Sequence, residues 1–212
     1  MKRNIRRGIL ALLVIVFLIS GGMVIRQLLT YKEGEEIYNE AAELAHLPDF
    51  STVGEVPSVG SQSVPAPQTA YVDPYADLLK NMDFSALQEI NSDVQGWIVI
   101  PGTAISYPLL QGTDNDYYLN HTYKKSVSAV GAIFIDYRCS ADLTDFNTIV
   151  YGHRMNNGSM FAGLKYYKKQ SYYESHPKVY VTTDQGTFTY RIFSAYEGSA
   201  SGESYQLSFS TA

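Results

Sequence analysis

The sequence predicts a mainly β domain, a barrel or sandwich with short helical insertions, that follows an N-terminal transmembrane helix. Three observations predict this fold class. The first is a basic N-terminus followed by a long uncharged apolar run. The second is a series of short β-branched and aromatic runs separated by turns that contain Gly or Pro. The third is an aromatic content dominated by 18 tyrosines and 9 phenylalanines, residue types that favour half-buried strand surfaces.

The N-terminus carries the clearest physical signal. Residues 1–7 contain four basic side chains, and residues 8–25 contain no charge. As a helix, this run would be about 27 Å long at about 1.5 Å per residue, close to a hydrocarbon core of about 30 Å. The basic flank should stay cytoplasmic, which places the rest of the chain outside the cell. We therefore interpret residues 1–30 as a single-pass signal anchor in the cell membrane; a cleaved signal peptide is the alternative.

The following residues predict a connection between the membrane and a folded domain. Residues 31–47 indicate a polar juxtamembrane helix with Ile37, Ala41 and Leu44 on one stripe. Residues 48–72 are rich in Pro, Ser and Gly, which is typical of a flexible spacer that holds a domain away from the membrane. The domain then covers residues 73–212. The net charge of −5 argues against a nucleic-acid partner.

The domain is predicted to begin with helices and to continue with strands. Residues 73–91 suggest two short helices, the second capped by Asp83 or Ser85. Two further short helices fit residues 115–120 and 159–167, and we assign Trp97 to the core. The expected strands are residues 96–100, 105–110, 131–136, 148–151, 178–183 and 187–196.

His153 is the leading candidate for chemistry because it follows directly after a predicted strand, in "TIVYGHRM". The end of a strand holds a side chain in a fixed place, and Gly152 would let the chain turn and let a ligand approach. An imidazole with a near-neutral pKa can act as general acid and general base. The alternative is a histidine that only caps the strand or bonds a loop carbonyl.

Cys139, the single cysteine, precedes His153 by fourteen positions. The two could form a nucleophilic pair for acyl transfer if the thiol were a thiolate beside the imidazole. Cys139 lies among loop residues with no nucleophile motif, so we interpret it as a free surface or half-buried thiol. His121 and His176 are expected to cap helices or to face solvent. No two histidines have a metal-ligand spacing, and the sequence predicts no metal and no cofactor.

Three blocks of the sequence resemble the sortases, and most of all class B sortases. They are "GWIVIPGTAISYPLLQGTDNDYYLNHTY", "GAIFIDYR" and "TIVYGHRMNNGSMFAGLKYY", in the order and spacing of that family. The resemblance implies an eight-stranded β-barrel and a membrane-anchored cysteine transpeptidase of Gram-positive bacteria. Such an enzyme cleaves the C-terminal sorting signal of a secreted protein and transfers the acyl group to an amine of the cell wall or of a pilin. It needs no cofactor, although some sortases bind calcium.

The resemblance also implies roles for particular residues. His153 corresponds to the catalytic histidine that protonates the leaving amine, and Tyr151 corresponds to a residue that lines the substrate groove. Asn115 and Leu119 also correspond to groove residues. They are four positions apart, so we expect them to share one helix face. The alternative for this pair is a helix that packs its leucine into the barrel.

The sequence departs from the family at the nucleophile. The T-L-x-T-C motif and the arginine that follows it do not occur, and Cys139 stands where the family commonly has asparagine. We therefore expect the last two strands to lie outside this sequence, through a partial gene, a frameshifted gene or a genuinely shortened protein. The chain alone is then expected to be inactive. Two alternatives stay open: a non-catalytic, membrane-tethered peptide-binding module, and an unrelated acyl-transfer enzyme that uses Cys139 and His153.

Overall fold

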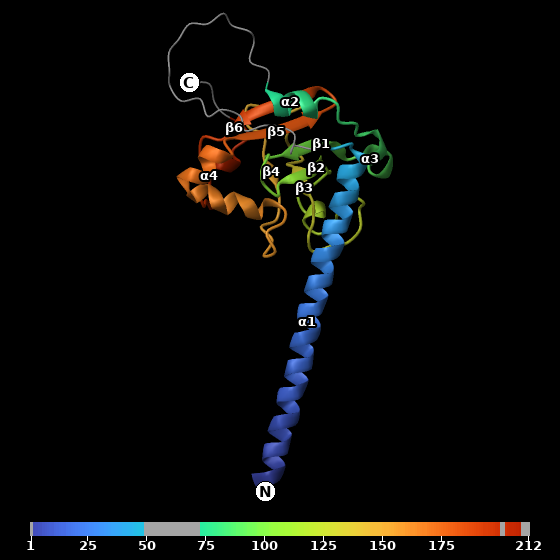
Figure 1. The fold of residues 1–212 in the computed structure, drawn as a ribbon, viewed down its shortest axis with the longest axis vertical. Coiled ribbons are helices and arrows are strands. Elements are labelled where there is room, and N and C mark those ends of the chain that lie inside the picture. Colours follow the sequence, from blue (N-terminus) through green and yellow to red (C-terminus); the bar gives the residue numbers. More distant parts are fainter. Residues whose placement is uncertain (1, 49–72, 200–201, 209–212) are drawn as a thin grey trace, which may run out of the picture.

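The computed structural model describes residues 2–48, 73–199 and 202–208. One long helix, α1 (Lys2–Leu44), extends from a domain built on a curled sheet (Figure 1). The predicted spacer, apart from residue 48, lies outside the described residues. The expected curled β fold with an N-terminal apolar helix is confirmed.

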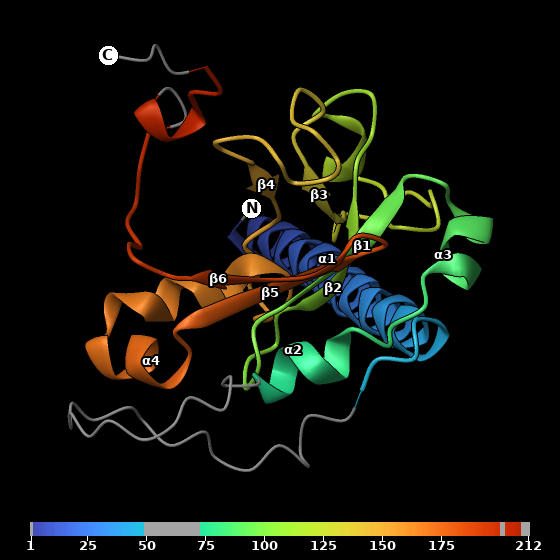
Figure 2. The ribbon, with the colours of Figure 1, turned by 90° about the horizontal axis from the view of Figure 1, so that it is seen from above.

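The sheet has six strands in the order β4-β3-β2-β1-β5-β6, so β4 and β6 form its two edges (Figure 2). Strands β2 and β3 are parallel, and the other neighbours are antiparallel. All six predicted strands are present, although the last ends earlier than expected. Their bounds are β1 (Val94–Val99), β2 (Ser106–Leu110), β3 (Ile133–Ile135), β4 (Val150–Tyr151), β5 (Lys178–Thr183) and β6 (Gly186–Arg191).

The core is centred on β1 and β2, the middle strands of the sheet. Trp97 in β1 is fully buried, which confirms its assignment to the core, and its indole N–H donates to the Ser106 hydroxyl at 3.0 Å. The two predicted helices before β1 are α2 (Pro74–Leu79) and α3 (Ser85–Ile90). The N-cap of α3 is Phe84, so neither Asp83 nor Ser85 is the predicted cap, although the Asp83 carboxylate accepts a hydrogen bond from the Ser85 N–H at 2.9 Å.

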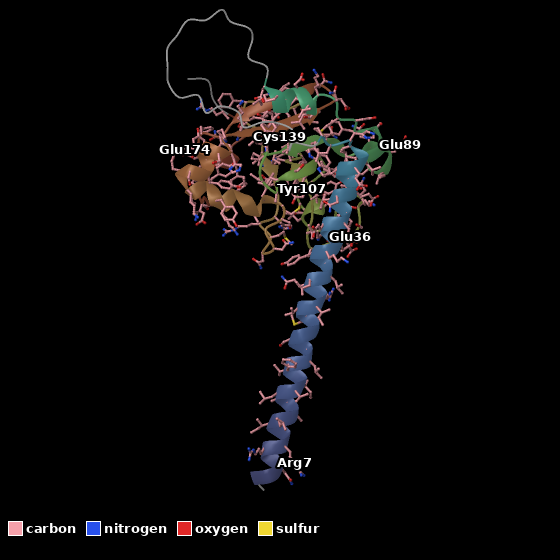
Figure 3. All side chains as sticks on the ribbon, in the orientation of Figure 1. Arg7, Glu36, Glu89, Tyr107, Cys139 and Glu174 are labelled. Atoms are coloured by element: carbon pink, nitrogen blue, oxygen red, sulfur yellow. The ribbon has the colours of Figure 1, made fainter. Side chains whose placement is uncertain are left out.

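Helix α1 runs without a break through the boundary expected at residue 30. An 18-residue window near its N-terminus has a mean hydropathy of 2.8 with no residue buried, so this part is a candidate membrane span. Figure 3 shows Arg7 at the far end of α1 and Glu36 where the helix reaches the domain. Around and beyond this point one stripe is buried against the domain; it consists of Gly34, Tyr38 and Ala41 of α1 and of Ala45, which directly follows the helix. The end of α1 is therefore part of the folded domain, rather than the separate juxtamembrane helix that the sequence predicted.

The helical insertions are short and partly 3₁₀ in geometry. The predicted helix at 115–120 is reduced to the single turn η2 (Tyr117–Leu119), and the Asp114 carboxylate accepts from the N–H groups of Asp116 and Tyr117 at its start. Asn115 and Leu119 consequently do not share a helix face, and that prediction was wrong. The remaining helices are η3 (Phe161–Lys168), α4 (Gln170–Ser175) and η4 (Glu203–Tyr205).

Candidate active site

His153 lies two residues beyond β4 and is fixed at both its ring and its backbone. Its Nε2 lies 2.5 Å from the carbonyl oxygen of Leu119, at the end of η2. Its own carbonyl accepts a hydrogen bond from the Phe161 N–H at 2.9 Å. A carbonyl oxygen can only accept, so in the neutral ring the proton is on Nε2. The other ring nitrogen, Nδ1, has no hydrogen-bond partner among the described residues and can exchange a proton.

Gly131 makes this contact possible. Its backbone has a φ of +62°, in the left-handed region that favours glycine. A Cβ at this position would lie 2.7 Å from the Leu119 oxygen and 3.0 Å from Cδ2 of His153. Only a residue without a side chain lets Leu119 and His153 meet here.

Gly152 is required for packing and not for the reason that the sequence suggested. A Cβ on it would lie 2.3 Å from Cδ1 of Ile133 and 2.7 Å from Cδ2 of Phe161. Two side chains of the domain interior therefore fill the space beside Gly152. The expected turn and ligand approach at this glycine are not what the structure shows.

Asp136, directly after β3, connects the other predicted site residues. It is fully buried, and its Oδ2 accepts from the Tyr151 hydroxyl and from the Asn115 amide, each at 2.9 Å. The Arg138 guanidinium donates to both carboxylate oxygens, at 2.9 and 2.7 Å. The Asn115 side-chain oxygen also accepts from the Tyr137 N–H at 3.1 Å. Tyr151 and Asn115, predicted as groove residues from separate parts of the chain, thus meet at one carboxylate.

The charge of Asp136 is stabilised by this arrangement. The hydrogen bonds from the Arg138 guanidinium hold the pKa of the Asp136 carboxyl far below its usual range, against the opposing effect of burial. Burial, together with the neighbouring carboxylate, raises the pKa of Tyr151 to about 12. Tyr151 therefore keeps its proton at neutral pH and acts as a hydrogen-bond donor.

Aromatic rings fix Tyr151 from two sides. Phe134 of β3 lies 5.3 Å away between ring centroids, and Tyr205 of η4 stacks on it at 6.3 Å with an interplanar angle of 13°. The Asn147 side-chain amide donates to the backbone carbonyls of Ser204 and Gln206, at 3.2 and 2.9 Å. The segment 202–208 is thereby attached beside β4 (Figure 2).

Leu119 is the apolar member of the site. Its side chain is 40% exposed, beside a carbonyl that already bonds His153. The alternative of a leucine packed into the barrel is therefore wrong. An exposed leucine next to an anchored imidazole can contact a bound apolar group.

Cys139 is buried, with 7% of its surface exposed, which corrects the expectation of a surface or half-buried thiol. Its Sγ lies 3.8 Å from the Asn147 carbonyl oxygen, a weak hydrogen bond. Burial raises the pKa of the thiol, which is opposite to what a reactive thiolate needs. Among the described residues, no hydrogen bond joins the Cys139 thiol to the His153 imidazole: the thiol bonds the Asn147 carbonyl and the imidazole bonds the Leu119 carbonyl.

The other two histidines in the domain bond helix ends. His121 Nδ1 lies 2.8 Å from the Tyr117 carbonyl, and His176 Nδ1 lies 3.0 Å from the Tyr172 carbonyl at the end of α4. Both positions agree with the predicted capping role. Within the described residues, no three His, Cys, Asp or Glu side chains gather as a possible metal site.

A curled mixed sheet preceded by a long apolar helix is the fold of a sortase-type domain. The sortase domain profile matches residues 98–207, about half of the chain, and the chain belongs to the sortase family.

Its similarity is to class B. It is 44% identical over 111 residues to sortase B of Listeria monocytogenes, covering 52% of this chain and 45% of that protein. The solved structure of sortase B from Bacillus anthracis in complex with AAEK1 has a TM-score of 0.60 at 30% identity and covers 83% of this chain and 75% of that one. A substrate complex of Staphylococcus aureus sortase B has a TM-score of 0.58 at 36% identity, covering 60% and 59%. The chain spans about half the length of the curated relatives it matches.

Sequence reasoning missed Asp136 and Arg138. Both lie in the segment "GAIFIDYR", whose resemblance to the sortase family says nothing about a role for its charged residues. The usable signal was an acidic residue that ends a wholly apolar strand, with a basic residue two positions later. A buried carboxylate in such a place needs partners, and the structure supplies them.

Proposed function

We propose that the chain carries the peptide-binding and acid–base half of a class B sortase-type transpeptidase. In this proposal, Leu119, Tyr151 and Asn115 line the groove that takes the sorting signal of a secreted protein, and His153 is the catalytic histidine. The observation that carries the proposal is the anchored His153 ring, bonded to the backbone of the exposed Leu119, in a member of the sortase family.

His153 acts twice in the proposed reaction. A cysteine thiolate attacks the carbonyl carbon of the threonine in the sorting signal, and the peptide bond to the next residue breaks. The protonated imidazole gives its proton to the leaving amine, and a thioester remains. The neutral imidazole then accepts a proton from the incoming amine, which attacks the thioester and releases the thiolate. Nδ1 is the nitrogen that exchanges these protons, since Nε2 is bonded to Leu119. We do not assign Cys139 as the nucleophile.

The cellular setting follows from α1. We propose that its apolar part crosses the cell membrane once, with the basic N-terminal flank in the cytoplasm and the domain outside. The acceptor is an amine of a cell-wall precursor or of a pilin, presented on that outer side. The membrane is then a structural partner of the protein.

Peptide binding tests this proposal without requiring turnover. The full chain in detergent micelles is titrated with fluorescent peptides that carry the C-terminal sorting signals of secreted proteins from the same organism. We expect saturable binding of at least one peptide and about tenfold weaker binding by Leu119→Ala, because the loss of a buried leucine contact costs about 1.5 kcal/mol or more.

Leu164→Ala is the matched control, because Leu164 is also 40% exposed but lies in η3. It should bind the peptide like the unaltered chain. Equal weakening by both variants, or no saturable binding of any peptide, would contradict the proposed groove.

Binding without turnover is the second candidate function for this chain, and the buried Cys139 favours it. Its high thiol pKa and its separate hydrogen bond are unsuited to nucleophilic attack. If the chain cleaves a peptide that it binds, and Cys139→Ala abolishes the cleavage, the binding-only function is wrong. Binding with no cleavage supports it.

A further inference from the structure

We infer that the domain end of α1 is a positioning element for His153, and that Tyr38 is the residue through which it acts. The catalytic meaning of this inference rests on the proposed function, but the structural coupling does not. Tyr38 reaches the His153 region by two separate sets of contacts. Both begin on the buried stripe of α1.

The first set of contacts passes through Gly131. The Tyr38 hydroxyl donates a buried hydrogen bond to the Gly131 carbonyl, across 93 positions of the sequence. Gly131 in turn lies against the Leu119 oxygen and Cδ2 of His153, closely enough that no Cβ would fit. A shift of the Gly131 backbone therefore displaces the imidazole or the carbonyl that holds it.

The second set passes through Tyr107 of β2. The rings of Tyr38 and Tyr107 meet edge to face, with centroids 5.2 Å apart and an interplanar angle of 89°. The Tyr107 hydroxyl accepts the Met160 N–H at 2.8 Å. Met160 has a φ of 54°, an uncommon conformation for a residue with a side chain, so this bond holds a strained backbone position.

Met160 belongs to the loop that carries His153. It forms an antiparallel bridge with Arg154, and the next residue, Phe161, donates its N–H to the His153 carbonyl at 2.9 Å. Tyr107 thus fixes one end of the loop and the Phe161 bond closes it on His153. The Tyr38 ring is the support on which Tyr107 packs.

The fit of α1 makes this coupling rigid. A Cβ on Gly34 would lie 2.8 Å from Cγ2 of Val130, so the helix contacts the segment before Gly131 as closely as it can. A cavity of about 420 Å³ lies beside the contact, with Tyr31, Tyr38, Tyr107 and Met160 among its lining residues. Figure 3 shows Tyr107 in the domain beside α1.

The coupling makes the candidate membrane helix and the site one mechanical unit. Gly34 lies four positions beyond residue 30, the expected end of the anchor, a rise of about 6 Å in one helix. His153 is therefore held at a fixed height above the membrane surface, rather than on a flexible tether. A site at fixed height suits an acceptor that is itself presented at that surface.

The test compares Tyr38→Phe with Tyr31→Phe in the full chain in detergent micelles. Tyr31 lies on the same helix and lines the same cavity, but within the described part of the chain its hydroxyl only accepts a hydrogen bond from the Gln27 amide. With ¹³C-labelled histidine, the four histidines give four ring signals that NMR can follow separately. We expect Tyr38→Phe to shift and broaden the His153 signal, while the His176 signal is unchanged. Tyr31→Phe should leave both unchanged.

Two further measurements complete the test. The affinity for the sorting-signal peptide should fall about fivefold in Tyr38→Phe, the effect of one lost hydrogen bond. Tyr107→Phe, which removes the acceptor of the Met160 N–H, should move the same His153 signal. If Trp97 fluorescence shows that Tyr38→Phe does not fold, the His153 signal of Tyr107→Phe tests the coupling between α1 and His153 instead.

An unchanged His153 signal in folded Tyr38→Phe, or an equal change in Tyr31→Phe, overturns the inference. If the unaltered chain binds no peptide, the proposed function fails. The His153 signal still decides the coupling in that case, so the two failures are distinguishable.

Discussion

Replacing Asp136 by alanine is expected to lower the free energy of unfolding by about 3 kcal/mol, because it removes the acceptor of a buried network. The Tyr151 hydroxyl, the Asn115 amide and the Arg138 guanidinium all donate to this fully buried carboxylate. Without the carboxylate, the Tyr151 hydroxyl and the Asn115 amide lose their hydrogen-bond acceptor inside the domain. Urea unfolding of the full chain in detergent micelles, followed by fluorescence of the single tryptophan, Trp97, measures the change.

The pH dependence of the free energy of unfolding isolates the contribution of the negative charge of Asp136, because Asp136→Asn keeps the size of the side chain but removes the charge. Because the folded-state pKa is held far below that of an unfolded aspartate, about 3.9, the ionised form contributes stability that is fully present above about pH 4. This contribution is lost as the pH falls further towards the folded-state pKa. The stability difference between the unaltered chain and Asp136→Asn should therefore be constant between about pH 5 and pH 7 and narrow below about pH 4. A difference that grows on acidification would contradict the assignment.

Gly96→Ala is expected to destabilise the sheet by about 3 kcal/mol, because a methyl group has no space there. Its Cβ would lie 2.0 Å from the backbone oxygen of Thr182 and 3.1 Å from Cα of Thr183, both in β5. Strand β5 is paired with β1 on one side and with β6 on the other, so it cannot move away without breaking a ladder. Gly96 also lies where the β1–β2 register shifts, a point at which a glycine often marks a bulge.

Gly163→Ala is the matched control for this substitution. The nearest atom to a Cβ at Gly163 is Cδ1 of Ile105 at 3.7 Å, an ordinary contact. The same urea and fluorescence measurement should show little change for this variant. If the free energies of unfolding of the two variants differ by less than about 1 kcal/mol, the claim that β5 leaves no space for a methyl group at Gly96 is wrong.

The central strands could be predicted because their pattern is local. Residues 96–100 and 105–110 combine β-branched and aromatic residues between turns, and the structure places β1 and β2 there. The helix at 115–120 was predicted too long: the Asp114 carboxylate accepts from the N–H groups of Asp116 and Tyr117, and a single turn, Tyr117–Leu119, follows. At residue 30, where the sequence predicted the end of the anchor, α1 continues without a break. A change from apolar to polar composition marks a change of solvent, and a helix can continue through it.

The site was predicted in part, and the missing part depends on long-range contacts. His153 was a candidate from its place after a predicted strand, and Tyr151, Asn115 and Leu119 came from resemblance. The structure shows the surroundings of all four without testing their roles. The meeting of Tyr151 and Asn115 at Asp136 joins segments from three parts of the chain, which no local pattern reveals. The support from Tyr38 is still more distant in sequence, because it comes from the helix that the sequence assigned to the membrane connection.

The central claim is that the region around His153 and Leu119 binds the sorting signal. The most direct test follows the ¹³C-labelled histidine signals of the full chain while the tightest-binding sorting-signal peptide is added. The account predicts a saturable shift of the His153 signal, with the dissociation constant found by fluorescence, and no shift of His176. A peptide that saturates the protein while the His153 signal stays fixed would contradict it.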